Sequence, residues 1–396
     1  MRTPGFHARR WLNSNRDDWF EWVSGPASAR LERMDRLSHA VMSMTRDLIG
    51  HGGAAELVAA LPATLERCNE LAFDTDVETL AYSVWHLVER YVRVIEVLDD
   101  LLRSGDLPLR KTRLTALEVG AGPMPALHAV RDFYADLAQW SQARSGAASI
   151  VGATHLYTLD RSPGWGRFNH CVGERLMHLG DQEGPHKFAT DFLDFQSFSV
   201  RAAHRGAIKR AATQLYTESL EWGESRLTLG EARSQVGSSH SGPPGAIDLM
   251  IVCNFLTETS MTTQFESEIA ELARSLTPGG VLMMIGSASD DYDEIFDSLD
   301  AIVQRAKTVK RLAPRRQLVR VNSDLRERVT QTLVTVLRVI EAGDRGAFDS
   351  VRDQLPKDVR HPGSTPVNLP RFRLALYKNE RPGALTGRAR RMARFA

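Results

Sequence analysis

The sequence predicts an α/β protein in which a doubly wound, mostly parallel sheet follows an N-terminal all-helical domain. Two observations predict this fold class. Up to residue 112, apolar residues recur every three or four positions, which is the spacing of amphipathic helices. From residue 113 onward, short apolar runs alternate with helical stretches, a pattern typical of parallel strands buried on both faces. A chain of 396 residues is long enough to contain both units.

Residues 1–112 form the predicted helical domain. We expect helices over 31–50 and 77–102, and between them a segment in which Pro62 starts or kinks a helix. Asp76 precedes the strongest apolar stripe and is predicted to cap its N-terminus. Four aromatic side chains of that stripe recur at helical spacing: Tyr82, Trp85, His86 and Tyr91. We interpret them as core packing, with a substrate-facing lid as the alternative.

Residues 113–396 form the predicted α/β domain. The apolar runs that contain its expected strands lie at 114–122, 154–162, 186–195, 246–255, 280–289 and 371–379. Two predicted insertions interrupt the alternation of strands and helices. The first, 196–245, ends in a Ser/Gly/Pro-rich stretch typical of a surface loop. The second, 322–368, contains an amphipathic helix from Asn322 to about Ala342.

The composition is that of an ordinary globular protein, with 42% apolar and 25% charged residues. The formal net charge is +1, so no global field points to nucleic acid or to a membrane. Cys68, Cys171 and Cys253 are far apart, and we predict neither a disulfide framework nor a structural metal site. No apolar run has the length of a signal peptide or a membrane span. We therefore predict a cytoplasmic protein.

One strand-to-turn segment carries most of the functional information. In LEVGAG, Glu118 stands near the end of an expected strand, before a Gly-Ala-Gly turn at 120–122 and a helix. Glycines at such a turn allow a ligand to approach the backbone closely. Enzymes that bind NAD use a related turn, with a third glycine, to hold a pyrophosphate at a helix N-terminus. Here Pro-Met-Pro occupies that place, which disfavours an NAD-dependent oxidoreductase.

Together with later landmarks, LEVGAG resembles the first motif of class I S-adenosylmethionine-dependent methyltransferases, in which an acidic residue precedes a Gly-x-Gly turn. Acidic residues end the next two expected strands, with Asp160 in LYTLD and Asp191 in ATDFLDF. The fourth strand, IDLMIVCNFLTE, ends at Asn254. LTPGGVLMMIG matches the Pro-Gly-Gly turn that enters the family's fifth strand. The resemblance covers about 114–287, plus the last strand at 371–379.

The resemblance implies a Rossmann-like fold, S-adenosylmethionine as the cofactor and methyl transfer as the activity. In the family, the residue at Asp160 binds the ribose hydroxyls, and the residue at Asn254 faces the reactive methyl. Carboxylates suit such roles because they accept strong hydrogen bonds from a diol or an ammonium group. The implied cofactor-binding residues are Glu118, Gly120, Ala121, Gly122, Asp160, Asp191, Phe192 and Asn254. The predicted catalytic residues are Asn254 and, as a proton acceptor just beyond the fourth strand, Glu258.

Two features depart from known patterns. Asp160 lies 38 residues after Gly122, against ~20 in compact dinucleotide-binding units. We expect a long helix from Ala126 to about Ala143, and the loop after it, to absorb the excess. The fourth strand is followed by Asn-Phe-Leu-Thr. Enzymes that methylate amino groups of nucleic-acid bases have Asn/Asp-Pro-Pro-aromatic there, so the sequence disfavours such a base as the substrate.

The methyl acceptor is open between alternatives. We favour a small molecule, such as a bacterial secondary metabolite, because the added helices and loops can close a pocket over it. RNA is the alternative, since Arg305–Arg320 contains seven cations and no acid, and the basic C-terminal tail adds more. A non-catalytic assembly factor that keeps the fold is a third reading. The helical domain suits a homodimer interface or a lid, and no membrane partner is expected.

Overall fold

The computed structural model describes residues 12, 15–25, 28–68, 70–110, 113–145, 150–160, 162–179, 187–191, 247–289, 291–312, 317–362 and 369–380. The predicted insertion at 196–245 and the basic tail after residue 380 lie outside this part of the chain. Within the described ranges, no helix combines the length and the apolar composition needed to cross a membrane.

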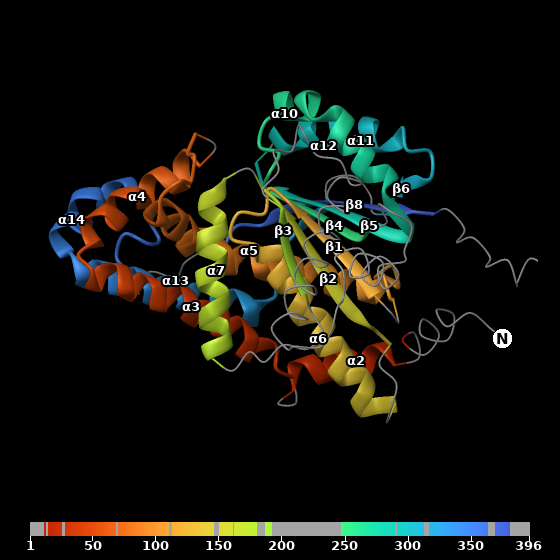
Figure 1. The fold of residues 1–396 in the computed structure, drawn as a ribbon, viewed down its shortest axis with the longest axis horizontal. Coiled ribbons are helices and arrows are strands. Elements are labelled where there is room, and N and C mark those ends of the chain that lie inside the picture. Colours follow the sequence, from red (N-terminus) through yellow and green to blue (C-terminus); the bar gives the residue numbers. More distant parts are fainter. Residues whose placement is uncertain are drawn as a thin grey trace, which may run out of the picture.

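The described strands form one eight-stranded sheet in the order β3-β2-β1-β4-β5-β8-β6, with β7 pairing to β8 (Figure 1). The parallel strands are β1 (Arg113–Val119), β2 (Ala153–Leu159), β3 (Lys187–Asp191), β4 (Ile247–Cys253) and β5 (Leu276–Ser287). The antiparallel part consists of β6 (Val309–Arg311), β7 (Gln317–Val319) and β8 (Phe372–Asn379). The predicted mostly parallel sheet is therefore confirmed, and each predicted apolar run contains a strand. The short β6 and β7 were not predicted.

Helices cover both faces of this sheet, which makes it doubly wound (Figure 1). One face packs against α5 (Asp76–Ser104) and α6 (Pro125–Ser145), and α7 (Pro163–His178) joins the same core. The other face packs against α10 (Thr259–Gln264), α11 (Glu266–Arg274) and α12 (Asp291–Gln304). Successive side chains of β4 alternate between the two cores, as Ile251 and Val252 do. Both faces of each central strand are buried, which explains why these strands appear as continuous apolar runs.

The helical layer combines segments from both ends of the chain. Its N-terminal members are α2 (Arg16–Ser24), α3 (Arg30–Gly50), α4 (Ala54–Glu66) and α5. From the predicted second insertion, α13 (Ser323–Gly343) and α14 (Arg345–Val351) pack against α3, α4 and α5 (Figure 1). The short 3-10 helix Arg352–Gln354 follows α14. The buried stripe of α13 runs from Leu325 to Ile340, so this helix completes the apolar core that the N-terminal helices begin.

Two local expectations in the N-terminal helices need correction. Asp76 is the first residue of α5 and not its cap, because Thr75 has the extended backbone of a cap and accepts a hydrogen bond from Glu78 N at 3.1 Å. Asp76 instead adds negative charge to the first turn, which suits the helix dipole. Pro62 lies inside α4 and does not start it.

The position of a ligand site follows from the strand order. β1 and β4 are neighbours in the sheet, although β2 and β3 lie between them in the sequence. The chain leaves β1 for α6 on one face, and it leaves β4 for α10 and α11 on the other. In open α/β sheets, a crevice forms at the carboxyl ends of the strands where the winding reverses, and ligands bind there.

Candidate functional site

A cavity of about 350 Å³ opens at this crevice. Its walls come from the turns that follow β1, β2 and β4, from Cys68 and 71–73 before α5, and from α5, α7 and α10. Five of the predicted site residues line it: Gly120, Gly122, Asp160, Asn254 and Glu258. Its volume lies within the ~300–1,000 Å³ of ordinary small-molecule sites.

The turn after β1 has a backbone that favours glycine. Gly120 and Gly122 have φ angles of 62° and 51°, in the left-handed region that side chains make costly. Gly120 N donates to Leu159 O at 2.8 Å, which fastens the turn to the end of β2. A Cβ on Gly120 would lie 2.2 Å from Phe255 Cδ2. Position 120 therefore excludes any side chain while Phe255 keeps its place.

Asp160 joins the turns that follow β1 and β2. It comes directly after β2, as the sequence predicts. One carboxylate oxygen accepts a hydrogen bond from Gly122 N at 2.8 Å, and the other accepts one from Ser162 N at 3.0 Å. Its carboxylate lies at the cavity wall, so Asp160 both shapes the two turns and presents negative charge to a ligand.

Glu118, which the sequence predicts to bind the cofactor, has its carboxylate buried behind the turn. It is only 1% exposed and is not among the residues that line the cavity. Its two carboxylate oxygens accept hydrogen bonds from Ala126 N at 3.2 Å and Leu127 N at 3.0 Å, at the start of α6. Burial raises the pKa of Glu118 to about 8, against the opposing effect of these two hydrogen bonds. Glu118 thus ties β1 to α6 behind the glycine turn.

Asn254 presents an unsatisfied acceptor at the cavity. It follows β4 with φ at 51°, a conformation that asparagine tolerates better than most residues. Its backbone N donates to Ile285 O at 2.8 Å, which fixes the residue at the end of β5. Its side-chain Oδ1 is buried, and no described group donates to it. Buried polar atoms are nearly always hydrogen-bonded in folded proteins, so this oxygen points to a ligand donor.

The remaining predicted residues are placed as follows. Glu258 is exposed at the cavity rim and accepts a hydrogen bond from Ser260 Oγ at 3.1 Å. Ala121 is buried, and its N donates to Leu159 O at 3.3 Å, so it supports the turn without lining the cavity. Asp191 is the last residue of β3, in register with Leu159. The side chain of Asp191 and the whole of Phe192 lie outside the described part of the chain.

An aromatic wall that the motifs did not identify closes one side of the cavity. The ring centroids of Phe73 and Tyr82 are 5.1 Å apart, those of Phe73 and Trp165 are 4.9 Å apart, and those of Tyr82 and Trp165 are 5.5 Å apart. All three residues line the cavity. Tyr82 therefore packs in the core and also lines the cavity. The only local signal was the aromatic stripe on α5, since Phe73 and Trp165 belong to no motif.

The segment before α5 is fastened across the cavity to the start of α7. Ser162 Oγ donates to Phe73 O at 2.9 Å, and Arg167 Nη2 donates to Asp74 O at 2.5 Å. A Cβ on Gly164 would lie 1.9 Å from Phe73 O, so only glycine allows this approach. Phe73 itself has φ at 55°, which is costly for a bulky residue. The N-terminal helical unit therefore contributes part of the cavity wall.

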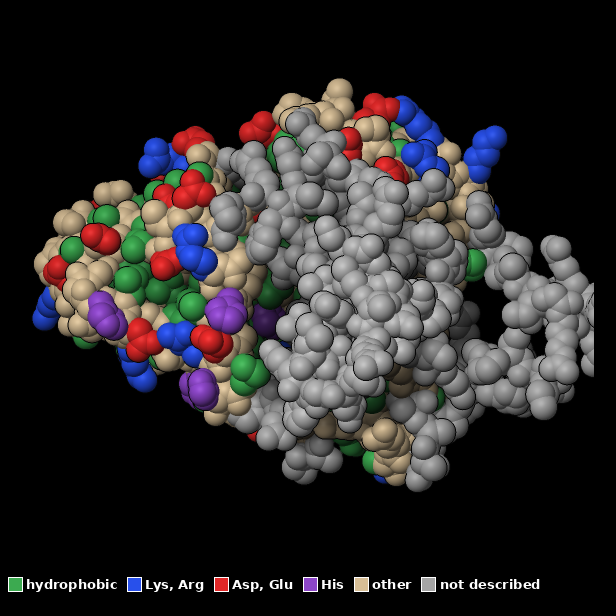
Figure 2. All heavy atoms as spheres, in the orientation of Figure 1, with side chains coloured by type: hydrophobic (Ala, Val, Ile, Leu, Met, Phe, Trp, Pro, Cys, Tyr) green, Lys and Arg blue, Asp and Glu red, His purple; other side chains and the backbone are tan. Residues whose placement is uncertain are grey.

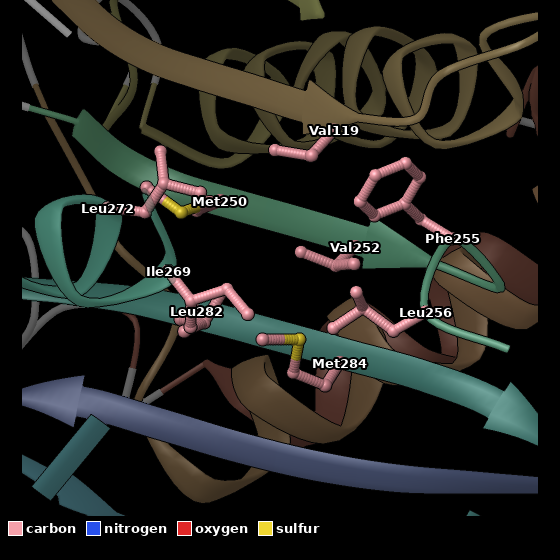
Figure 3. Close-up of a pocket in the computed structure, with 9 residues that line it drawn as sticks. All are labelled: Val119, Met250, Val252, Phe255, Leu256, Ile269, Leu272, Leu282 and Met284. Carbon is pink, nitrogen blue, oxygen red and sulfur yellow. The ribbon is translucent and has the colours of Figure 1, made fainter. Parts of the chain in front are cut away.

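A second, smaller cavity lies between the sheet and α11 (Figure 3). Its volume is about 10 Å³, and apolar side chains from β1, β4, β5 and α11 point into it. Phe255 and Leu256 stand at its end, beside the last residues of β4 (Figure 3). A space of this size holds at most one water, and it offers that water no polar partner. We regard it as a packing void of the core and not as a ligand site.

The larger cavity combines hydrogen-bond acceptors with aromatic faces. Asp160, Glu258 and the Asn254 side-chain oxygen accept hydrogen bonds, and the rings of Phe73 and Trp165 offer flat apolar surfaces. Such a lining suits a ligand that has hydroxyl or ammonium donors, a positive charge and a flat ring system. Within the part of the chain that the structure describes, no group of three or more metal-binding side chains gathers.

Comparisons with known proteins give matches of structure only. No protein-family model matches the chain, and no curated protein matches it either. N-methyltransferase NodS from Bradyrhizobium japonicum WM9, solved with S-adenosylhomocysteine, is 13% identical, over 74% of this chain and 86% of that one, with a TM-score of 0.30. Loganic acid methyltransferase with S-adenosylhomocysteine is 7% identical, over 76% and 95%, with a TM-score of 0.37.

A third similar structure is an S-adenosylmethionine-dependent methyltransferase from Clostridium acetobutylicum ATCC 824. It is 7% identical, over 75% of this chain and 94% of that one, with a TM-score of 0.33. The fold class itself follows from this chain's own strand order and register. The chain therefore has an α/β fold with a mostly parallel sheet, preceded by helices.

Proposed function

We propose that this protein is an S-adenosylmethionine-dependent methyltransferase that acts on a small molecule. The observation that carries the proposal is the convergence of residues from three separate motifs on one cavity. Gly120 and Gly122 come from the turn after β1, Asp160 from the end of β2, and Asn254 and Glu258 from the segment after β4. These residues were selected from the sequence alone.

The cavity lining fits the chemistry of this cofactor. S-adenosylmethionine is a sulfonium cation with an amino-acid tail, a ribose diol and an adenine, and when bound it supplies an electrophilic methyl group. Asp160 would hold the ribose, because a carboxylate accepts strong hydrogen bonds from a diol. Asn254 would receive a donor on its unpartnered oxygen. The rings of Phe73 and Trp165 would pack against the adenine or the cation.

The residues of this chain contribute mainly positioning and the exclusion of water. Two reactants that are held in a fixed arrangement react faster because part of the entropy cost is met on binding. The segment fastened by Ser162 and Arg167 forms one wall of the cavity and would help to keep water away from the reacting atoms. The exposed carboxylate of Glu258 at the rim is available to accept a proton from the acceptor.

The charge pattern of the basic stretch favours a small acceptor over RNA. Three of its described cations, Arg305, Lys310 and Arg311, form ion pairs with Glu266, Glu380 and Asp300. Paired cations attract phosphates less strongly than free ones. Over the described part of the face in Figure 2, cations and acids are interspersed. This distribution differs from the clustered positive face typical of nucleic-acid binding.

Calorimetric titration with S-adenosylmethionine, S-adenosylhomocysteine and NAD in parallel tests the cofactor. We expect micromolar binding of the first two and none of NAD. Asp160→Asn keeps the side-chain size and removes the charge, so we expect S-adenosylhomocysteine to bind ~10-fold more weakly or worse. Asp353→Asn is the matched control, because that carboxylate is 99% exposed and far from the cavity in sequence. Binding of NAD alone, or unchanged affinity in Asp160→Asn, would overturn the proposal.

A further inference from the structure

The cavity has two ends, because its walls belong to the cores on both faces of the sheet. Tyr82 and Trp165 belong to the core that α5 and α6 complete. Phe265 belongs to the core on the opposite face, and Phe255 and Met261 pack against that core. Figure 3 shows Phe255 at the end of β4, beside this second core. The cavity therefore runs across the carboxyl edge of the sheet from one core to the other.

Each end of the cavity carries one carboxylate. Asp160 lies at the end of the aromatic wall, since it accepts a hydrogen bond from Gly122 N at 2.8 Å and a Cβ on Gly122 would lie 3.6 Å from the Trp165 ring. Glu258 lies at the other end, directly before α10, the helix that carries Met261. The proposed function places the ribose of the cofactor at Asp160. The end beside α10 is therefore left for the methyl acceptor.

The end beside α10 combines an apolar wall with polar groups at its rim. The ring centroids of Phe255 and Phe265 lie 5.6 Å apart, with 33° between the ring planes. Met261 adds a flexible apolar side chain that adapts to the shape of a ligand. Glu258 and Gln264, at the two ends of α10, supply the polar groups, and both are exposed. A ligand with an apolar body and one polar end fits such a wall.

The described lining of the cavity is acidic. Its charged side chains are Asp160 and Glu258, and no described Lys, Arg or His belongs to it. Arg90 lies behind the aromatic wall, where it is 7% exposed and donates a hydrogen bond to the Tyr82 hydroxyl. Because opposite charges attract and like charges repel, this lining favours a cationic group and disfavours a carboxylate or a phosphate. RNA is disfavoured for the same reason.

We propose that the methyl acceptor is an amine on an apolar body, with its nitrogen beside the Glu258 carboxylate and its body on Phe255 and Phe265. The proposal rests on the proposed function and names the substrate class of that site. A carboxylate accepts strong, charge-assisted hydrogen bonds from ammonium N–H groups. The two rings and the Met261 side chain offer apolar area to the body of the acceptor.

Methyl transfer to an amine fits these residues. The acceptor arrives as an ammonium ion, and Glu258 passes one of its protons to water at the exposed rim. The nitrogen lone pair then forms a bond to the methyl carbon, the bond between that carbon and sulfur breaks, and its electron pair stays on sulfur. Positive charge moves from sulfur to nitrogen, where the Glu258 carboxylate stabilises it as it develops. The product remains an ammonium ion, so no proton moves in the transfer step.

An alcohol fits this lining less well, because it must lose its proton to become a good nucleophile. A carboxylate exposed to water is a weak base for that step, and the described lining contains no His or Lys. The nitrogen of an amine offers its lone pair without such a base.

Binding of matched amines, alcohols and acids tests this proposal. One series of probes is 2-phenylethylamine, 2-phenylethanol and 3-phenylpropanoate, and the other is hexylamine, hexanol and hexanoate. Each probe is titrated calorimetrically into the chain saturated with S-adenosylhomocysteine. Within a series the apolar body is similar and the charge differs. We expect at least one amine to bind, its alcohol to bind ~3- to 10-fold more weakly, and its acid to bind more weakly still.

Two variants separate the charge of Glu258 from its shape. In Glu258→Gln the amine affinity should fall ~3- to 10-fold, while the alcohol and S-adenosylhomocysteine bind as before. Glu258→Lys, which the exposed position tolerates, should reverse the order and favour the acid. Glu294→Gln is the matched control and should bind the amine as the wild type does. The Glu294 carboxylate is exposed and accepts a hydrogen bond from Thr259 Oγ1 of α10 at 3.5 Å, but it does not line the cavity.

The outcomes that overturn this proposal differ from those that overturn the proposed function. The amine proposal is wrong if no amine binds, if an alcohol or an acid binds as tightly as its amine, or if Glu258→Gln keeps the amine affinity of the wild type. Failure of S-adenosylhomocysteine to bind would instead contradict the proposed function. The same titrations on the chain alone would then decide whether Glu258 selects amines.

Discussion

The ring of Phe255 packs so closely on Gly120 that a Cβ at position 120 would stand 2.2 Å from Phe255 Cδ2. The two residues follow neighbouring strands, β1 and β4, and this contact closes the space between the turns at the centre of the sheet. The same turn uses φ angles that only glycine adopts freely. Steric and conformational limits therefore act together at the point where the cofactor is proposed to bind.

The first prediction concerns this glycine. Gly120→Ala should displace Phe255 or the turn, and we expect S-adenosylhomocysteine affinity to fall ~10-fold or more, as measured by calorimetry. Gly173→Ala is the control, because a Cβ there meets open space within α7, where alanine is the better helix former. Wild-type affinity in Gly120→Ala would show that the turn does not approach the ligand.

The second prediction concerns Glu118 and pH. Its pKa is about 8 in the folded chain against an ordinary value of 4.5, so between these values the folded state binds the extra proton. The stabilisation is complete below about pH 4.5 and is lost as pH rises towards 8. The free energy of unfolding should therefore fall by roughly 3–5 kcal/mol over this window, relative to Glu118→Gln. Urea titrations at several pH values measure both proteins, and parallel curves would contradict the prediction.

The third prediction concerns the segment before α5 that forms one wall of the cavity. Ser162→Ala removes the hydrogen bond to Phe73 O and should loosen this segment. We expect S-adenosylhomocysteine to bind roughly 3- to 10-fold more weakly, mainly through faster dissociation, with little change in the melting temperature. Ser350→Ala is the control, since that hydroxyl also donates to a backbone carbonyl, in α14 away from the cavity. Stopped-flow kinetics measure the rate at which S-adenosylhomocysteine dissociates from each variant. Equal dissociation rates in Ser162→Ala and Ser350→Ala would contradict the prediction.

The fourth prediction compares a buried and an exposed ion pair. Asp99 is 8% exposed and accepts hydrogen bonds from Arg30 at 2.7 and 3.1 Å and from Trp19 Nε1 at 3.2 Å. Asp99→Ala leaves a buried cation without its partner and should cost about 3–5 kcal/mol of unfolding free energy. Asp353→Ala removes an exposed partner of Arg360 and should cost about 0–1 kcal/mol. Urea denaturation of the two variants checks the difference.

Strands that are buried on both faces were predictable because their sequences are continuous apolar runs. β1, β4 and β5 each carry such a run, and β8 repeats it late in the chain. The strands β6 and β7 were not predicted because each has only three residues and lies in the basic stretch, without an apolar run. Each is defined by its hydrogen bonds to β8, which is distant in the sequence. The cap of α5 at Thr75 was missed by one position, since Thr and Asp both favour such sites.

The sequence by itself determined the fold class, the order of the motifs along the chain, and the places of Gly120, Asp160 and Asn254 after the ends of strands, because these depend on local patterns of burial and backbone conformation. Only the tertiary structure decided which way Glu118 points and which side chains complete the cavity. Phe73 and Trp165 meet across more than ninety positions of sequence, and a contact between such distant segments leaves no periodic signal in either one. The buried state of Arg90 depends on the same packing, since burial is a property of the assembled core.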